Sequence, residues 1–190
     1  QPKSKWGEVW ISRTGYTGEE GFEIMAEASE AASLWKRLRE AGRPWDLKPV
    51  GFGARDTLRL ESGMLLYGQD MYYTTSAVEA GLGWAVDFDK ERFVGRDRNL
   101  REKEKGASRR LVGFEMIERG IPRHGFIIEK EGRSLGQVTS GSFAPTLKKN
   151  IGLGYVSLEA SQVGTEFDIV IRDQKVKARV VLLPFYRRKS

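Results

Sequence analysis

Two arginines, Arg55 and Arg59, lie four residues apart in the segment GARDTLRLE. If this segment forms a helix, the two guanidinium groups share one face a turn apart, which is mildly unfavourable for like charges. Asp56 and Glu61 each lie within a turn of Arg59 and offer an ordinary surface pair of small energy. Arg55 poses the sharper question, because a guanidinium in a partly apolar site must be paired by a structural acid, a ligand carboxylate or a ring carbonyl.

Glu23 is the carboxylate that could act together with Arg55. Phe22 and Ile24 share one face of the expected strand, so Glu23 points to the other face. A carboxylate accepts two parallel N–H donors, such as a 2-amino-4-oxo heterocycle presents, and Tyr16 is close in sequence as an aromatic wall. The plain alternative is that Glu23 faces water. Glu23 and Arg55 on separate elements could otherwise hold opposite parts of one flat, polar, anionic ligand.

A third candidate is the segment TSGSFAPTLKKN, residues 139–150. Its glycine, hydroxyl residues and proline predict a turn-rich loop whose backbone N–H groups could receive an anion beside Lys148 and Lys149. A barrel loop fixed by its own hydrogen bonds is an equal alternative. The single histidine, His124, lies in the turn-like GIPRHGF, and one histidine supplies too few parts for a histidine metal site or a catalytic triad.

Composition excludes several classes of site. The 190 residues include no cysteine, which removes thiol catalysis, disulfides and cysteine-ligated metals. The net charge of +6 favours anionic ligands or acidic partners. Nucleic acid ranks low as a partner, because the basic residues are dispersed apart from RRK at 187–189. With no apolar run of membrane-spanning length and no basic-then-apolar start, we expect a soluble cytoplasmic chain without a membrane partner.

Strands and helices alternate in the N-terminal part of the chain. Strands are predicted at about 7–13 and 21–26 around a glycine-rich turn, and Ser29 is expected to cap a helix that runs to about Ala41. Further along, a strand is expected to end near Phe88. A short helix is predicted within the charged segment FVGRDRNLREKEKGASRR.

From Arg110 onward, short strands alternate with glycine-containing turns, as in RLVGFEM, IGLGYVSL and FDIVIRDQKVKARVVLLP. Closely spaced strands of this kind predict a small antiparallel barrel or sandwich. We place a domain boundary in the preceding charge run, between residues 1–104 and 105–190. The expected fold class is therefore α+β.

Several segments, taken together and in order, resemble the T-protein of the glycine cleavage system, a tetrahydrofolate-dependent aminomethyltransferase. They are RTGYTGEEGFEI, GARDTLRLESGMLLYGQD, SAVEAGLGWAVDFDK, FVGRD, LVGFEM, RGIPRHG, VTSGSFAPTLKKNIGLGYV and LPFY. The resemblance extends from about Trp6 to Tyr186. It implies part of a folate-binding α/β domain over residues 1–104, followed by a small antiparallel β-barrel domain over residues 105–190.

The resemblance also implies roles for individual residues. Glu23 matches the glutamate that binds the pterin ring, Arg55 matches an arginine that contacts the folate, and Tyr16 matches a tyrosine near it. The basic residue after the final PF strand is Arg187, with Arg188 as the alternative. Arg59 is then left as a structural partner of Asp56 or another acid. No metal is expected.

The implied reaction transfers the aminomethyl carbon from lipoylated H-protein to tetrahydrofolate and releases ammonia. Family members are about twice this long, and their N-terminal half carries the aspartate thought to assist the transfer, so no catalytic residue is assigned here. The candidate partners are therefore lipoylated H-protein and a separate N-terminal chain. The alternatives are a folate-binding module or split subunit without activity of its own, a purely structural fragment, or a related folate-dependent demethylase. Ala77 departs from the family by replacing a proline.

Overall fold

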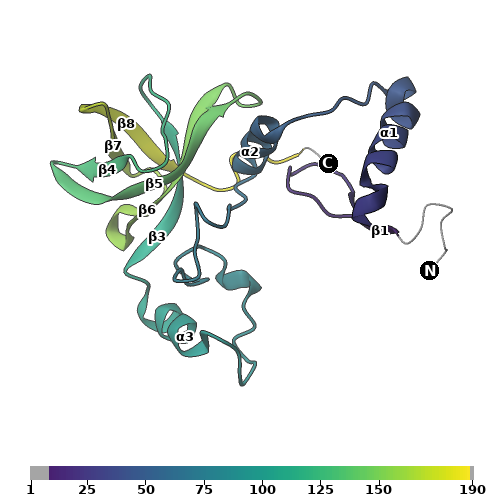
Figure 1. Cartoon of the computed structure of the whole chain (residues 1–190). Helices are drawn as coiled ribbons and strands as arrows, with labels where there is room; N and C mark the ends of the chain where they lie inside the picture. Colours follow the sequence, from purple (N-terminus) through teal and green to yellow (C-terminus); the bar gives the residue numbers. More distant parts are fainter. Residues whose placement is uncertain (1–8, 189–190) are drawn as a thin grey trace.

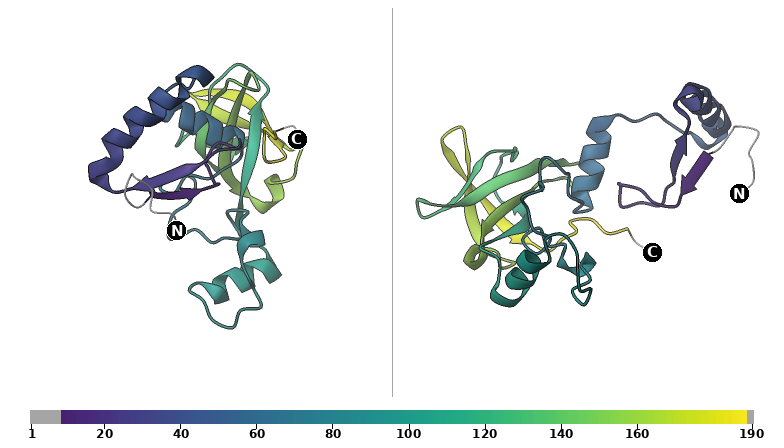
Figure 2. Two further views of the ribbon diagram at one scale, coloured as in Figure 1. Left: turned by 90° about the vertical axis from the view of Figure 1, so that its right-hand side faces the viewer. Right: turned by 60° about the horizontal axis from the view of Figure 1, so that its bottom comes forward.

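Helix α2 (Phe52–Glu61) lies between two parts of the molecule, and a third part extends from one of them (Figure 1). The computed structural model describes residues 9–188. A hairpin and helix α1 (Ala31–Gly42) lie on one side of α2 and a β-barrel on the other, while the segment around α3 (Arg96–Lys105) extends from the barrel (Figure 1). The right-hand view of Figure 2 keeps this separation. The expected α+β class is confirmed.

The N-terminal hairpin confirms the predicted pair of strands within the described residues, which leave out residues 7 and 8. Strand β1 (Val9–Ser12) pairs antiparallel with β2 (Glu23–Ala26), so that Ser12 lies opposite Glu23. The connection between them, residues 13–22, is called here the β1–β2 loop. Because Glu23 pairs with Ser12, it lies at the end of the hairpin that carries this loop.

Helix α1 begins later than expected. The prediction that Ser29 caps it is wrong, because Ser29 lies inside a 3-10 turn, η1 (Ala28–Glu30), and the N-cap of α1 is Glu30 without a side-chain hydrogen bond. The 3-10 turn supplies the first turn of the helix in place of a cap. Leu34, Leu38 and Ala41 line a cavity of about 230 Å³ that α1 shares with β1 and β2. A second 3-10 turn, η2 (Arg43–Trp45), follows α1.

The segment between α2 and α3 contains no strand, so the strand predicted to end near Phe88 is wrong. Its only regular element is a 3-10 turn, η3 (Gly83–Ala85). Gly63, Gly68 and Gly81 have positive φ angles of 67°, 85° and 74°. Such angles turn the chain away from an extended path, and residues 62–95 therefore form consecutive turns. The short helix predicted within the charged segment is confirmed as α3.

The C-terminal part is a closed antiparallel barrel, which decides between the predicted barrel and sandwich. Its strands follow the order β3-β6-β5-β4-β7-β8, and β8 pairs with β3 to close it. A 3-10 turn, η4 (Leu158–Ala160), follows β6. The strands are β3 (Arg109–Met116), β4 (Ile127–Lys130), β5 (Arg133–Ala144), β6 (Lys149–Ser157), β7 (Glu166–Ile171) and β8 (Gln174–Val181). Residues 139–144 thus belong to β5 and residues 149–150 to β6, so the prediction of a turn-rich loop over 139–150 is wrong except for residues 145–148.

Two apolar clusters hold the barrel and its neighbour together. The barrel interior is centred on Phe114 and Phe167, whose rings meet edge to face with centroids 5.6 Å apart. The second cluster lies between α2 and the barrel. Its buried members are Leu60, Leu111, Ala144, Ile151, Leu153 and Tyr155. Leu60 of α2 is therefore part of a core that is otherwise built by β3, β5 and β6.

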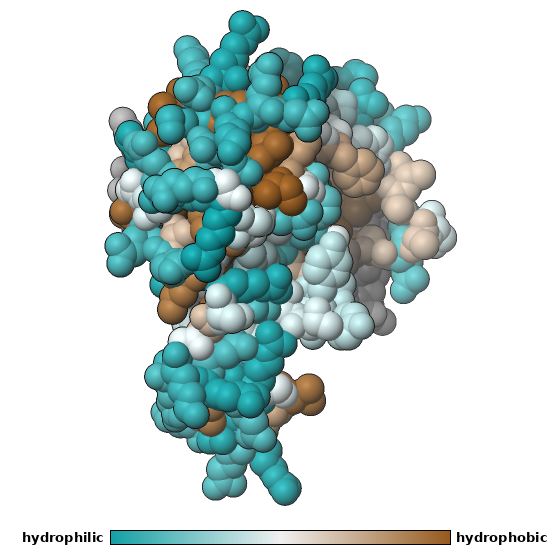
Figure 3. Space-filling model, turned by 90° about the vertical axis from the view of Figure 1, so that its left-hand side faces the viewer, coloured by the Kyte–Doolittle hydropathy of each residue, from teal (hydrophilic) through white to brown (hydrophobic). Residues whose placement is uncertain are grey.

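The hairpin and α1 lack a comparable core. No residue between positions 9 and 58 is buried. The large exposed apolar side chains of this stretch include Trp10, Ile11, Phe22, Met25, Trp35, Trp45 and Phe52. Hydrophilic side chains, by contrast, dominate the face seen from the barrel side (Figure 3). A layer of strands and helix normally buries its apolar face against a second layer, and the described chain supplies none here.

No helix within residues 9–188 has the length and apolar character needed to cross a bilayer.

Candidate functional site

The β1–β2 loop brings together three of the residues that the sequence singled out. The Oγ1 hydroxyl of Thr14 donates a hydrogen bond to Oε2 of Glu23. Two residues further on, the Tyr16 hydroxyl donates to the carbonyl oxygen of Leu65. The guanidinium carbon of Arg55 lies 4.6 Å from the centroid of the Tyr16 ring. Glu23, Tyr16 and Arg55 are therefore all held by one short segment of chain.

Close contact with the end of α2 fixes the path of this loop. The Ser62 hydroxyl donates to the carbonyl oxygen of Thr17 over 3.0 Å. Gly18 follows with a φ of 73°, and a Cβ atom there would lie 2.0 Å from the Ser62 Oγ. Only glycine combines this backbone conformation with so close an approach. The loop is consequently attached to the same helix that carries Arg55.

The two charged groups of the site are not neutralised by the rest of the described chain. Arg55 makes no ion pair within residues 9–188, because its neighbour Asp56 pairs with Arg59 instead. Glu23 is exposed and accepts its hydrogen bond from Thr14 alone in that range. Burial raises the pKa of Tyr16, so its hydroxyl stays protonated at neutral pH and remains a donor to Leu65. The site thus offers a free carboxylate and a free guanidinium.

The C-terminal tail runs past the same loop and distinguishes two adjacent arginines. The Tyr186 hydroxyl donates to Glu19 over 2.7 Å. Arg188 forms ion pairs with Glu19 and Glu20 at 3.7 and 3.2 Å. Arg187 is exposed and has no ion pair among the residues that the structure describes. Of the two candidates, Arg187 is therefore the one whose charge is available to an anion.

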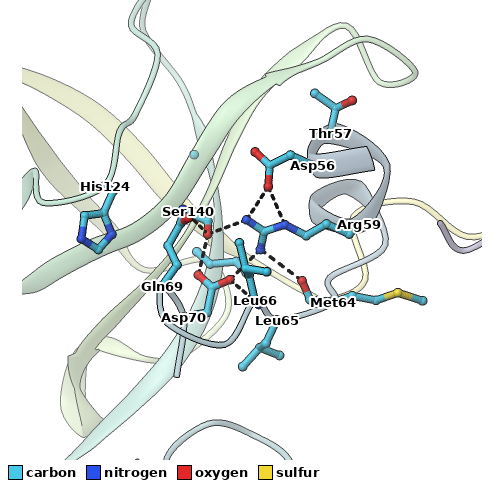
Figure 4. A network of polar contacts seen from close by, with 12 residues as sticks. Asp56, Thr57, Arg59, Met64, Leu65, Leu66, Gln69, Asp70, His124 and Ser140 are labelled. Atoms are coloured by element: carbon cyan, nitrogen blue, oxygen red, sulfur yellow. Dashed lines mark hydrogen bonds and ion pairs between the residues drawn. The ribbon is translucent and has the colours of Figure 1, made fainter. Parts of the chain in front are cut away.

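Arg59 follows Arg55 by one turn of α2 but is buried, and it has the structural role expected for it (Figure 4). Its guanidinium is 1% exposed and contacts Oδ1 of Asp56 at 2.7 Å and Oδ2 of Asp70 at 2.5 Å. Burial alone would lower the pKa of Arg59, but the two carboxylates outweigh it and the pKa is raised. Glu61 is not a partner of Arg59, because its Oε1 accepts the backbone N–H of Thr146 over 2.9 Å.

Asp70 is the centre of this buried network and was not predicted. Its side chain is fully buried, and its Oδ1 accepts hydrogen bonds from the hydroxyls of Thr139 and Ser140, each over 2.6 Å. Its Oδ2 also accepts the N–H of Leu66 over 2.9 Å. The network therefore ties α2 and the segment that follows it to β5. This attachment fixes the helix from which Arg55 projects toward the β1–β2 loop.

A hydroxyl from β6 completes the attachment. Tyr155 donates to the backbone carbonyl of Asp70 over 2.9 Å. Burial raises the pKa of Tyr155 to about 12, so this hydroxyl remains a donor throughout the neutral range.

Ala77, expected from the resemblance to replace a proline, makes a contact that proline could not. Its backbone N–H donates to Oδ1 of Asn99 over 3.0 Å, and proline has no such donor. The nearby Glu79 is buried and pairs with Arg98 and Arg109 at 3.3 and 3.1 Å. The hydrogen bond of Ala77 ties this turn to α3.

His124 is exposed, and its ring contacts β5 and not its own turn. Its Nδ1 lies 2.8 Å from the carbonyl oxygen of Thr139. Since a carbonyl can only accept, Nδ1 carries the proton. Among residues 9–188, no three histidine, aspartate or glutamate side chains are grouped in a way that could hold a metal ion.

Thr14, beside Glu23, and Asp70, in the buried network, are two residues that sequence analysis did not single out. Asp70 stands in the quoted segment LYGQD, and its position shortly after a paired arginine was the available signal. Thr14 stands in RTGYTGEEGFEI, nine residues before Glu23. Its contact depends on the hairpin register, which places the loop beside Glu23.

Comparison with known families assigns both parts of the chain. Residues 4–90 match the GCVT N-terminal domain. Residues 109–187 match the glycine cleavage T-protein C-terminal barrel domain.

Individual relatives agree with this assignment. An aminomethyltransferase from Desulforamulus reducens is 52% identical over 179 residues, which cover 94% of this chain and 49% of the relative. One from Symbiobacterium thermophilum is 53% identical over 178 residues, covering 93% of this chain and 48% of the relative. The chain thus spans about half the length of these curated relatives.

A solved structure shows the same relationship. The crystal structure of the glycine cleavage system aminomethyltransferase T from Bartonella henselae has a TM-score of 0.88 and is 36% identical, covering 98% of this chain and 50% of that one. The fold, both family matches and the relatives agree. The chain therefore belongs to the glycine cleavage T-protein family.

Proposed function

We propose that this chain is the C-terminal half of a tetrahydrofolate-dependent aminomethyltransferase, and that Glu23, Arg55, Tyr16 and Arg187 contribute to its folate site. One observation carries the proposal. A carboxylate and a guanidinium, both without ion pairs in the described chain, are held by the same short loop. Relatives that are 52% and 53% identical to this chain are named aminomethyltransferases. This supports the assignment of the reaction.

Each proposed group has a distinct task on a reduced folate. The Glu23 carboxylate accepts the two adjacent N–H donors of the pterin ring, since its oxygens can receive them in parallel. Arg55 and Arg187 donate to carbonyl or carboxylate oxygens of the same molecule. Tyr16 places its ring beneath the guanidinium of Arg55 and so limits the positions that the arginine can take.

The proposed reaction moves one carbon from the aminomethyl group on the lipoyl arm of H-protein to tetrahydrofolate, with release of ammonia. Folate nitrogens bond to this carbon while its bonds to the amino nitrogen, which leaves as ammonia, and to the lipoyl sulfur, which returns as a thiol, break. Holding folate and the aminomethyl carbon within contact distance contributes much of the rate. The residues described here hold the folate. We assign none of them the handling of protons.

We further propose that catalysis requires a second half that this sequence does not contain. Support comes from the hairpin and α1, which bury no residue between positions 9 and 58 and expose several tryptophans. An apolar surface of this kind marks a site for another layer of protein. In this arrangement, residues 1–104 belong to the shared folate-binding domain and residues 105–190 form the separate barrel domain.

A titration tests the proposed folate site. The chain is titrated calorimetrically with 5-formyltetrahydrofolate, alone and as a chimera in which it replaces the segment it matches in the Desulforamulus reducens relative. We expect binding by the chimera and weaker or no binding by the chain alone, because only the chimera has both halves of the site. Absence of binding by a folded chimera would contradict the proposal.

The observation that no residue from 9 to 58 is buried also favours a second candidate function. In this alternative, the chain is a folate-binding module that holds folate by itself, or a split subunit that docks on a separate N-terminal chain, in either case without turnover of its own. The titration distinguishes a self-sufficient folate-binding module from the first proposal. Such a module would bind 5-formyltetrahydrofolate equally well alone and in the chimera.

A further inference from the structure

We propose that Thr14 is a positioning residue that orients the Glu23 carboxylate for its ligand. The inference rests on the proposed function, in which Glu23 binds the pterin ring. Its basis is the hydrogen bond that the Thr14 hydroxyl donates to Oε2 of Glu23. Both residues lie at the loop end of the hairpin, where Ser12 pairs with Glu23. Thr14 thus reaches the carboxylate from the start of the β1–β2 loop, just after β1 ends, across the end of the hairpin.

The hydrogen bond leaves the carboxylate able to bind a ligand. An ionised carboxylate has about four lone-pair positions on its two oxygens. Thr14 occupies one position on Oε2, so Oε1 and the remaining position on Oε2 are available for two parallel donors. Glu23 is otherwise exposed, and a free glutamate side chain would lose rotamer freedom when the ligand binds. Thr14 fixes the carboxylate beforehand and thereby reduces this loss.

Thr14 can hold the carboxylate because its own segment is held. Tyr16, two residues further along, is bound to the Leu65 carbonyl through its hydroxyl and lies against Arg55 through its ring. The Thr17 carbonyl accepts a hydrogen bond from Ser62 at the end of α2. One anchored loop therefore positions both charged groups. The Tyr16 ring packs against the Arg55 guanidinium, and the Thr14 hydroxyl donates a hydrogen bond to the Glu23 carboxylate.

The test compares three single variants. Thr14→Val removes the hydroxyl at nearly constant size, and Thr14→Ser retains it. Thr17→Val is the matched control, because the Thr17 hydroxyl accepts only the nearby N–H of Glu19. Affinity for 5-formyltetrahydrofolate is measured in the 190-residue chain and in the Desulforamulus reducens chimera. We expect Thr14→Val to weaken binding about tenfold, while Thr14→Ser and Thr17→Val stay close to the unsubstituted protein.

Two further titrations separate positioning from a general effect on the loop. In the Glu23→Gln background, Thr14→Val should cost little additional affinity, because the charged acceptor that it orients is already gone. A folate analogue with a methyl group in place of the 2-amino group should also be much less sensitive to Thr14→Val. A merely structural role would instead reduce affinity equally in both backgrounds and for both ligands.

The possible failures are distinguishable. If Glu23→Gln weakens binding and Thr14→Val does not, the inference is wrong and the proposed folate site stands. If Thr14→Val and Glu23→Gln are fully additive, Thr14 acts on the fold rather than on Glu23, which also overturns the inference. If the unsubstituted protein binds no folate in either form, or Glu23→Gln is without effect, the proposed role of Glu23 fails and the inference fails with it.

Discussion

Replacing Asp70 with alanine is expected to lower the free energy of unfolding by about 3–5 kcal/mol, the range found when one partner of a buried ion pair is removed. Asp70 is fully buried and contacts Arg59, which is 1% exposed. Without it, the hydroxyls of Thr139 and Ser140 lose the acceptor that each now contacts at 2.6 Å. The measurement is urea denaturation followed by circular dichroism.

Asp56 provides the matched control for this prediction. It also pairs with Arg59, but its side chain is 50% exposed, and solvent screens such a pair. Asp56→Asn should therefore cost at most about 1 kcal/mol. Equal losses for the two variants would show that burial does not determine the contribution of this network, and would contradict our account of how α2 is attached to the barrel.

Replacing Glu23 with glutamine is expected to weaken the binding of 5-formyltetrahydrofolate about 100-fold, since two hydrogen bonds to a charged acceptor are changed. Glutamine keeps the size of the side chain but substitutes an NH₂ donor for one oxygen, and this donor faces the donors of the pterin ring. The side chain is exposed, so the fold should tolerate the change. The measurement is calorimetric titration of the chimera and of the chain.

Glu27→Gln is the control for the Glu23 variant. Glu27 is also an exposed glutamate, just beyond the same strand, and it makes no side-chain cap hydrogen bond at η1. We expect its replacement to leave the affinity unchanged. A loss of affinity in Glu27→Gln as large as that in Glu23→Gln would indicate a general effect of negative charge on this face, not a specific contact with the ligand.

The regular elements could largely be predicted from local sequence patterns. The hairpin, α2, α3 and the barrel strands follow from alternation, turn residues and charge. The expected strand near Phe88 failed because Gly83–Ala85 form a 3-10 turn and the chain turns again at residues 88–89. The start of α1 was misplaced at Ser29 because a 3-10 turn, which sequence patterns do not distinguish from a capped helix, precedes it.

The charged residues of the candidate site could be identified from the sequence, whereas the contacts that hold them could not. Arg59 could be assigned to Asp56 because an i,i+3 pair is a local feature of a helix. Its contact with Asp70 depends on how residues 62–70 turn back beneath α2, which no local pattern specifies. Thr14 was missed for the same reason, since its hydrogen bond to Glu23 requires the path of the whole β1–β2 loop.

Transfer of the aminomethyl group tests the central claim most directly. Ammonia release from aminomethylated, lipoylated H-protein is measured with the 190-residue chain and with the chimera, each with and without tetrahydrofolate. We predict release that depends on tetrahydrofolate for the chimera and none for the chain alone, because the chain supplies only its half of the folate site. A folded chimera that binds 5-formyltetrahydrofolate and releases no ammonia would contradict the account, and so would full activity of the chain alone.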